Sequence, residues 1–134
     1  MDCVYLAGPI NGKSDGECNG WRSQAKHWLG GSFVVRDPMS RDYRGREDES
    51  VREIVEGDLS DIRECRYVLV NASAPSWGTA MEVFFAWTSG KRVVAFTDSK
   101  RISPWLRFHT HAICQTVERA CFTILNFDVL TARK

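Results

Sequence analysis

Two carboxylates and a tyrosine are the residues whose types and spacing could carry out chemistry. Glu82 is the only charged residue in the stretch 71–87, and Asp58 precedes it by 24 positions. When two carboxyl groups share an apolar-walled pocket, their pKa values separate, so one can act as a nucleophile while the other transfers a proton. Such a pair can break a glycosidic bond through a covalent sugar–enzyme intermediate. The hydroxyl of Tyr5 could donate to the nucleophile and hold its position.

Each of these side chains also has a purely structural interpretation. Glu82 ends a capping-box pattern, in which it would only reach back to the backbone at the start of its own helix. Asp58 could pair with Arg63 or Arg66 near the end of its helix, and Tyr5 could be an ordinary core aromatic residue. The three residues together, on elements predicted to converge, favour the chemical interpretation.

The elements that must position these residues alternate between strands and helices. Short apolar and β-branched runs predict strands, and 3.6-residue periodicity or capping signals predict helices. Strands are expected at 4–7, 33–35, 67–70 and 92–96, and helices at 21–29, 51–62 and 79–87. A further helix or turn is expected to open at 103–105, and 117–127 is compatible with either a helix or a strand.

This alternation predicts an α/β fold with one domain over residues 1–134. We expect a flavodoxin-like or Rossmann-like parallel sheet of about five strands, with helices on both faces. The carboxyl ends of parallel strands share one edge, where small-molecule sites commonly form. The loops after residues 7, 35 and 70 would therefore open together.

The helix that carries Asp58 is predicted to begin with a capping box from Ser50 to Glu53. Asp58 shares the inward stripe of that helix, where a carboxylate is costly unless it is paired or used. The apolar positions of the stripe are Val51, Ile54, Val55, Leu59 and Ile62. The preceding stretch, 40–49, is dense in charge and is predicted to be a solvated, mobile loop.

Composition and charge exclude several classes of function. A net charge of +1 provides no basic field for a nucleic acid polymer. No apolar run approaches the roughly 20 residues of a membrane span, and the first residues lack a signal-peptide pattern, so a cytoplasmic location is expected. Five cysteines without a C-x-x-C spacing predict free thiols. His109 and His111 lack a matching second pair, so no metal site is expected.

The loop from Gly8 to Ser14 resembles a triphosphate-binding loop but fails on spacing. Three residues separate its glycines where the motif needs four, and the strand at 67–70 is followed by Asn71 rather than by a magnesium-binding aspartate. The backbone amides of this loop and Ser76 could still hold a monophosphate or a 5′-hydroxyl. Trp77 could stack on a planar base.

Taken together, these motifs resemble the nucleoside 2-deoxyribosyltransferase family, which also contains nucleotide N-glycosidases. The most specific match is the Gly-Thr-Ala-Met-Glu segment at 78–82 combined with the aspartate at 58. The matching segments, which lie within residues 3–111, are 4–10, 37–38, 54–59, 76–82 with Ala86, 90–94 and 103–105.

The resemblance implies a role for each matching residue. Glu82 would attack the anomeric carbon, Asp58 would pass a proton to the leaving base, and Tyr5 would orient the nucleophile. No cofactor is implied, and a homodimer or higher oligomer is expected, in which a neighbouring subunit helps to close the site. The residues expected to bind substrate are Gly8, Pro9, Ile10, Asn11, Asp37, Ser76, Trp77, Gly78 and Met81.

Departures from the family pattern leave the acceptor open. Ser76 stands where the transferases carry aspartate, and the nucleotide-hydrolysing branch has a serine there that helps to hold a 5′-phosphate. That branch also has serine and arginine in the first loop, where this chain has Pro9 and Asn11; Lys13 could supply the missing charge. We expect cleavage of the N-glycosidic bond of a 2′-deoxyribonucleoside or its 5′-monophosphate, with the sugar passed to another base. Water as the acceptor and a non-catalytic nucleotide-binding module are the alternatives.

Overall fold

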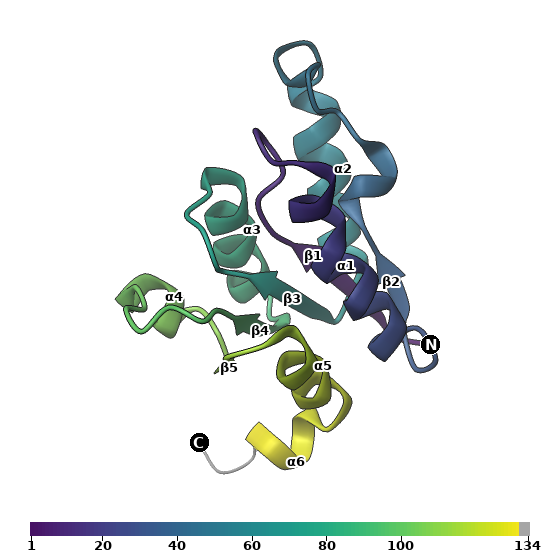
Figure 1. Ribbon diagram of the computed structural model, residues 1–134. Coiled ribbons are helices and arrows are strands. Elements are labelled where there is room, and N and C mark those ends of the chain that lie inside the picture. Colours follow the sequence, from purple (N-terminus) through teal and green to yellow (C-terminus); the bar gives the residue numbers. More distant parts are fainter. Residues whose placement is uncertain (132–134) are drawn as a thin grey trace.

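A five-stranded, all-parallel sheet lies at the centre of the computed structural model, which describes residues 1–131 (Figure 1). The strand order is β2-β1-β3-β4-β5, so β1 and β3 are neighbours in the middle of the sheet. Their register pairs Val4 with Tyr67 and Ala7 with Val70. The strands are β1 (Cys3–Ala7), β2 (Val34–Arg36), β3 (Tyr67–Asn71), β4 (Arg92–Phe96) and β5 (Ala112–Cys114).

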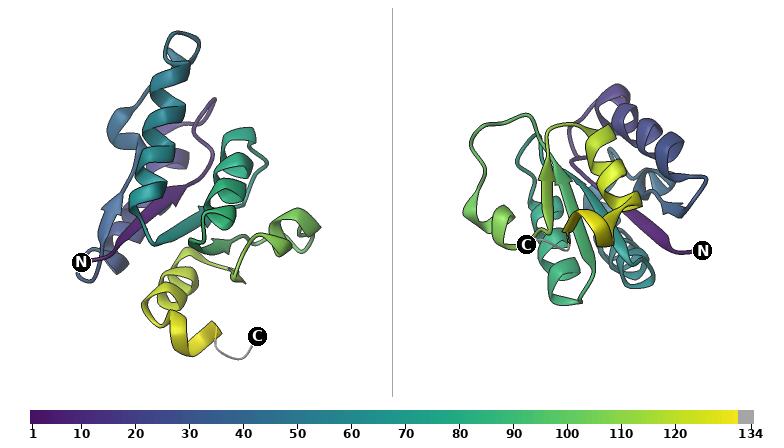
Figure 2. Two further views of the ribbon diagram at one scale, coloured as in Figure 1. Left: turned by 180° about the vertical axis from the view of Figure 1, so that it is seen from behind. Right: turned by 90° about the horizontal axis from the view of Figure 1, so that it is seen from below.

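Helices cover both faces of this sheet (Figure 2). The helices α1 and α5 pack together on one face, and α2 and α3 pack together on the other. The helices are α1 (Asp15–Leu29), α2 (Val51–Glu64), α3 (Trp77–Thr88), α4 (Pro104–Phe108), α5 (Val117–Leu125) and α6 (Phe127–Thr131), with 3-10 turns η1 (Pro38–Arg41) and η2 (Glu47–Glu49). The predicted α/β fold with a parallel sheet is confirmed. Across residues 1–131, no helix has the length and apolar character that crossing a bilayer requires.

The alternation of side chains along β1 divides the core into two layers. Val4 and Leu6 are fully buried against α1 and α5, whereas Tyr5 and Ala7 are fully buried in the layer beneath α2 and α3. Alternate residues of a strand point to opposite faces. Burial of each large apolar side chain contributes about 1.5–3 kcal/mol. A shift of β1 by one residue would therefore be strongly unfavourable, and Tyr5 is held on the α2–α3 side.

Two helices begin earlier than their sequences predicted. Helix α1 starts at Asp15 rather than at Trp21, because Ser14 and Glu17 form a capping box. The first turns contain two glycines and few apolar residues, so hydrophobic periodicity does not predict a helix there. Helix α3 starts at Trp77, where the Ser76 hydroxyl accepts a hydrogen bond from the amide of the residue three further on, at 3.3 Å.

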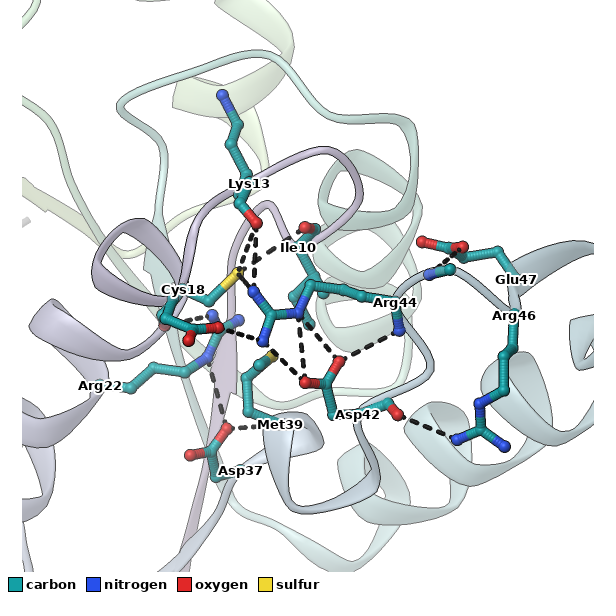
Figure 3. Close-up of polar contacts among 12 residues, drawn as sticks. Ile10, Lys13, Cys18, Arg22, Asp37, Met39, Asp42, Arg44, Arg46 and Glu47 are labelled. Carbon is teal, nitrogen blue, oxygen red and sulfur yellow. Dashed lines mark hydrogen bonds and ion pairs between the residues drawn. The ribbon is translucent and has the colours of Figure 1, made fainter.

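The charged segment 40–49 is more ordered than the predicted loop. It includes parts of η1 and η2, and the Arg44 guanidinium donates to the Lys13 carbonyl at 3.2 Å and to Asp42 at 2.7 Å (Figure 3). These contacts fasten the segment to the loop before α1. The charge density marked an ion-pair cluster, which composition alone did not distinguish from a solvated loop.

Further predictions about α2 and the later elements need correction. Helix α2 begins at the expected residue, but Ser50 makes no side-chain capping bond, so the predicted capping box is wrong. Val51 and Val55 are exposed rather than part of an inward stripe. The fifth strand is β5, a segment not singled out beforehand, and the ambiguous segment 117–127 contains α5 and the start of α6.

Cys3 and Cys65 are joined by a disulfide, contrary to the prediction that all five thiols are free. Cys65 lies two residues before β3, and the pairing of β1 with β3 brings it beside Cys3, with the two Cα atoms 4.5 Å apart. Linear spacing gave no sign of this proximity, because the two cysteines are 62 positions apart. Cys18, Cys114 and Cys121 are free thiols.

Replacing Gly8 by alanine is expected to reduce the free energy of unfolding by about 1–3 kcal/mol. A Cβ atom at Gly8 would lie 2.7 Å from the ring of Trp21, which is itself packed edge-on against Phe96 in the core. Urea unfolding measures the effect. Gly20→Ala is the matched control, because a Cβ there meets nothing within 4 Å and is expected to stabilise the helix by about 0.5–1 kcal/mol. Equal effects at both positions would contradict the steric explanation.

Candidate active site

The Tyr5 hydroxyl donates a hydrogen bond to Oε2 of Glu82, linking β1 to α3. Tyr5 is fully buried, so its hydroxyl has a fixed position. Glu82 lies on the side of α3 that faces the sheet. Because its carboxylate binds Tyr5, and Ser76 rather than Glu82 caps the helix, the capping-box alternative is wrong.

Asp58 of α2 completes the group from the neighbouring helix. Its negative charge is one of the causes that raise the pKa of the Glu82 carboxyl group, so the two carboxyls interact electrostatically. On its other side, Oδ1 of Asp58 lies 3.3 Å from the Arg41 guanidinium, which also donates to Asp61 at 2.7 Å. The predicted alternative pairing of Asp58 with the arginines at 63 or 66 is therefore wrong, because its partner comes from η1.

Burial raises the pKa values of both carboxyl groups. The pKa of Glu82 is raised to about 8 by burial first and then by the charge of Asp58, against the lowering effects of the Tyr5 hydrogen bond and the Arg22 charge. Burial also raises the pKa of Asp58, which the charge of Arg41 opposes. Two carboxyls in contact hold protons as a pair. We therefore expect one proton to be shared between them near neutral pH.

The same surroundings keep the phenol of Tyr5 protonated. Its pKa is raised far above the ordinary value by burial first and then by the negative charges of Glu82 and Asp58. Tyr5 can consequently act only as a hydrogen-bond donor to the carboxylate. This arrangement suits a residue that orients a nucleophile rather than one that takes up a proton.

Asp37 and Gly8 lie near the carboxyl end of β1 but serve structural contacts. The Asp37 carboxylate is nearly covered; it accepts from the Met39 amide at 2.9 Å and pairs with Lys26 at 2.6 Å and with Arg22 at 3.4 Å. The Gly8 carbonyl accepts from Arg22 at 3.2 Å. Substrate contacts by these residues, and by Pro9, Ile10 and Asn11 in the same loop, stay predictions.

The predicted substrate-binding residues at the start of α3 lie on different sides of the helix. Ser76 caps the helix, whereas Trp77 and Met81, four residues apart, are both exposed on its outer side. Gly78 is exposed in the first turn. Their roles in substrate binding stay predictions, and the outward direction of Trp77 and Met81 places them on a surface rather than beside Glu82.

A cavity of about 490 Å³ lies between α3 and α4, on the other side of α3 from the carboxyl pair. Ser76 and Thr79 line it together with Trp105 and His109, and none of the three candidate catalytic residues does. Its size suits a small molecule, but its lining has no acid that could act on a sugar. The catalytic role of the carboxyl pair at the edge of the sheet stays a prediction.

Sequence reasoning missed three charged residues of this site: Arg22, Arg41 and Asp61. Arg22 lies among the buried residues of α1, with Cys18 and Trp21 beside it. An arginine within the apolar stripe of a helix indicates a buried charge. The stripe of α1 becomes apparent only when the helix is extended back to include Cys18. Arg41 gave no comparable signal, because it is one of several arginines in the charged segment.

The part of the chain that the structure describes contains no cluster of three His, Cys, Asp or Glu side chains that could hold a metal ion. Of the acids near this site, Asp58 and Asp61 bind Arg41, and Glu82 accepts a hydrogen bond from Tyr5. What the arrangement offers chemically is a partly buried carboxylate held by a phenol, with a second carboxyl group that interacts with it electrostatically and can share its proton. These are the parts of a nucleophile and a general acid.

Comparison with known proteins gives one family match and several structures of the same fold. A sequence model of the nucleoside 2-deoxyribosyltransferase family matches residues 4–122. No curated protein matches the sequence.

Solved structures with the same fold include two enzymes named for 2-deoxyribosyl transfer. One, from Bacillus psychrosaccharolyticus, aligns with a TM-score of 0.71 and 20% identity over 96% of this chain and 94% of its own. The other, from Leishmania mexicana, aligns with a TM-score of 0.59 and 20% identity over 75% and 67%. A CMP N-glycosidase from Clostridium botulinum aligns with a TM-score of 0.65 and 17% identity over 93% and 99%.

Replacing Glu82 by glutamine is expected to raise the free energy of unfolding at pH 9 and to change it little at pH 4. Burial holds the pKa of the carboxyl group above its ordinary 4.5, so the wild-type protein loses stability as pH rises from that value through about 8, and a neutral amide avoids the loss. At about 1.4 kcal/mol per pKa unit, the shift from 4.5 to about 8 sets an upper limit of about 5 kcal/mol, and because Glu82 is only partly buried we expect a gain of roughly 2–4 kcal/mol.

Urea unfolding at the two pH values measures this difference, with the exposed Glu53→Gln as the matched control. A gain of equal size at pH 4 and pH 9 would show that ionisation of Glu82 is not its cause.

Proposed function

Because the chain belongs to the nucleoside 2-deoxyribosyltransferase family, we propose that it cleaves the N-glycosidic bond of a 2′-deoxyribonucleoside or its 5′-monophosphate and transfers the sugar to another base. The observation that carries this proposal is the hydrogen bond from Tyr5 to Glu82, with Asp58 near enough for its charge to raise the pKa of Glu82. A purely nucleotide-binding protein would gain nothing from two acids beside an anionic ligand. Catalysis is thus favoured over the alternative of a binding module.

In the first step the ionised carboxylate of Glu82 attacks C1′ of the sugar. The bond between C1′ and the base nitrogen breaks, and its electron pair leaves with the base, which takes the proton held by Asp58. The products are a free base and a sugar ester of Glu82. The hydrogen bond from Tyr5 holds the attacking oxygen on the line to C1′ and keeps the other oxygen from turning away.

In the second step the ester is opened at C1′ by an acceptor. Asp58, now ionised, takes a proton from the nitrogen of a second base or from water as that atom bonds to C1′, and Glu82 leaves as a carboxylate. The pair ends with the single proton with which it began. Water as the acceptor makes the protein a hydrolase, and this alternative is favoured by Ser76 at the position where the transferases carry aspartate.

Replacing Glu82 by alanine is expected to abolish turnover, because no other carboxylate contacts Tyr5 in the described part of the chain. Asp58→Asn keeps the nucleophile but loses the proton donor, and such losses commonly lower the rate by about 10²–10⁴-fold. Release of free base from deoxynucleosides and deoxynucleoside monophosphates, followed by chromatography, measures both variants. Full activity of Glu82→Ala on any substrate cleaved by the wild type would refute the mechanism.

Adding a second free base to the same assay distinguishes the three functions. A new nucleoside identifies a transferase, and free base with no new nucleoside identifies a hydrolase. A ligand that binds with measurable affinity but stays intact identifies a binding module. Running each base as the nucleoside and as its 5′-monophosphate shows whether the phosphate is required.

We also propose that the protein assembles as a homodimer or higher oligomer through an apolar surface on α3 and α4. Exposed fractions on this surface reach 85% for Trp77 and 75% for Trp105. Exposed apolar side chains gathered on one face commonly mark a protein interface. The surface consists of Trp77, Met81, Phe84, Trp105 and Phe108. Its proximity to the start of α3 supports a role for the neighbouring subunit in closing the site. A cytoplasmic location stays a prediction.

Trp105→Glu is expected to weaken this assembly by roughly 30-fold or more, because loss of an interface hot spot commonly costs about 2 kcal/mol. Sedimentation velocity over a concentration series measures the change. Val129→Glu is the matched control, since Val129 is equally exposed but lies on α6, away from this surface. A wild-type protein that stays monomeric at its highest soluble concentration would contradict the proposal.

A further inference from the structure

Arg22 of α1 is a charged side chain held inside the protein, with 1% of its surface exposed. It donates to the carbonyl oxygens of Cys18 at 2.8 Å and Gly8 at 3.2 Å, and its Nε lies 3.4 Å from Oδ1 of Asp37 (Figure 3). Its guanidinium also lies over the Trp21 ring, 4.6 Å from the ring centre. These contacts fix both the position and the orientation of the charge.

The Arg22 charge is only partly neutralised by its carboxylate partner. Asp37 also pairs with Lys26, at the shorter distance of 2.6 Å, so two cations share one carboxylate. A buried cation costs several kcal/mol unless its charge is matched. Burial accordingly lowers the pKa of Arg22, and the charge of Asp37 opposes that change. A net positive charge therefore remains inside the protein at this point.

That charge lies at the carboxyl end of the strand that carries Tyr5. Arg22 belongs to the α1 face of the sheet, but its bond to the Gly8 carbonyl brings it to the carboxyl end of β1, three residues beyond Tyr5. Burial and the charge of Asp58 raise the pKa of Glu82 to about 8, and Arg22 opposes this increase. It likewise opposes the increase in the pKa of Tyr5, whose largest cause is burial.

We propose that Arg22 is a positioning residue for the reaction of Glu82. It fixes the turn after β1 through the Gly8 carbonyl and supplies the positive charge that favours the ionised, attacking form of Glu82, while Asp37 holds it in place. This proposal rests on the function proposed above. The charged and titratable groups nearby are Tyr5, Asp58, Arg41 and Asp61 on the side of Glu82, and Cys18, Lys26 and Asp37 on the side of Arg22.

A substrate-free titration tests the proposal independently of any activity. Carbon-13 NMR of protein labelled at the glutamate carboxyl groups gives the titration midpoint of Glu82, assigned by the loss of its signal in Glu82→Gln. In Arg22→Met we expect this midpoint to rise by roughly one pH unit, the usual size of a nearby charge effect. Arg119→Met is the matched control, because Arg119 is exposed on α5, and it should leave the midpoint unchanged.

Two further variants keep the test decisive if Arg22→Met does not fold. Arg22→Lys retains the positive charge but loses the hydrogen bonds that only a guanidinium can make. The titration midpoint of Glu82 should therefore stay near its wild-type value. Asp37→Asn removes the shared anion, so the midpoint should fall rather than rise. An unchanged midpoint in Asp37→Asn, or in a folded Arg22→Met, would overturn the proposal.

Once a cleaved substrate is known, kcat/KM adds a second readout. The pH profile of kcat/KM reports the free enzyme, and it should move to higher pH in Arg22→Met and to lower pH in Asp37→Asn. A purely structural role would lower activity equally at every pH and move neither profile. Absence of cleavage by the wild-type protein would refute the proposed function but would leave the NMR test of Arg22 fully interpretable.

Discussion

The hydrogen bond from Tyr5 to the largely buried carboxylate of Glu82 is the interaction on which this structure depends. It joins a side chain fixed by β1 to one carried by α3, so both the sheet and the helix must be in place before the pair exists. Removing a carboxylate from water is costly, and the raised pKa of Glu82 measures that cost. The protein tolerates it because a phenol and a nearby arginine partly replace the lost water.

Two arginines act on the carboxyl pair, and they differ in how far each is buried. Arg22 is wholly enclosed and opposes the raised pKa of Glu82 from behind β1. Arg41 has about a third of its side chain exposed and divides its guanidinium between Asp58 and Asp61. The tighter contact is with Asp61, so Asp58 keeps an incomplete partner. An acid that must release and recover a proton is better served by such a partial ion pair than by a full one.

The fold and the three central residues could be predicted from the sequence, whereas the contacts around them could not. Buried strands are short apolar runs, and parallel strands bring their carboxyl ends to one edge; these local patterns and one topological rule sufficed to bring Tyr5, Asp58 and Glu82 together. The disulfide and the pairing of Asp58 with Arg41 depend on register and on the path of an irregular segment. Residues such as Asp37 matched a motif, but the motif did not reveal that an arginine and a lysine already bind its carboxylate.

Helix α3 links the chemistry to the outer surface of the protein. Its inner side presents Glu82 to Tyr5, while Trp77, Met81 and Phe84 are exposed on its other sides. Because a helix is rigid over a few turns, a partner that packs on the apolar surface restricts the position of the carboxylate one turn away. Binding energy at that surface can therefore hold Glu82 in the position that the proposed attack requires. On this argument, the apolar residues of α3 have a physical reason to lie beside a site whose chemistry they do not perform.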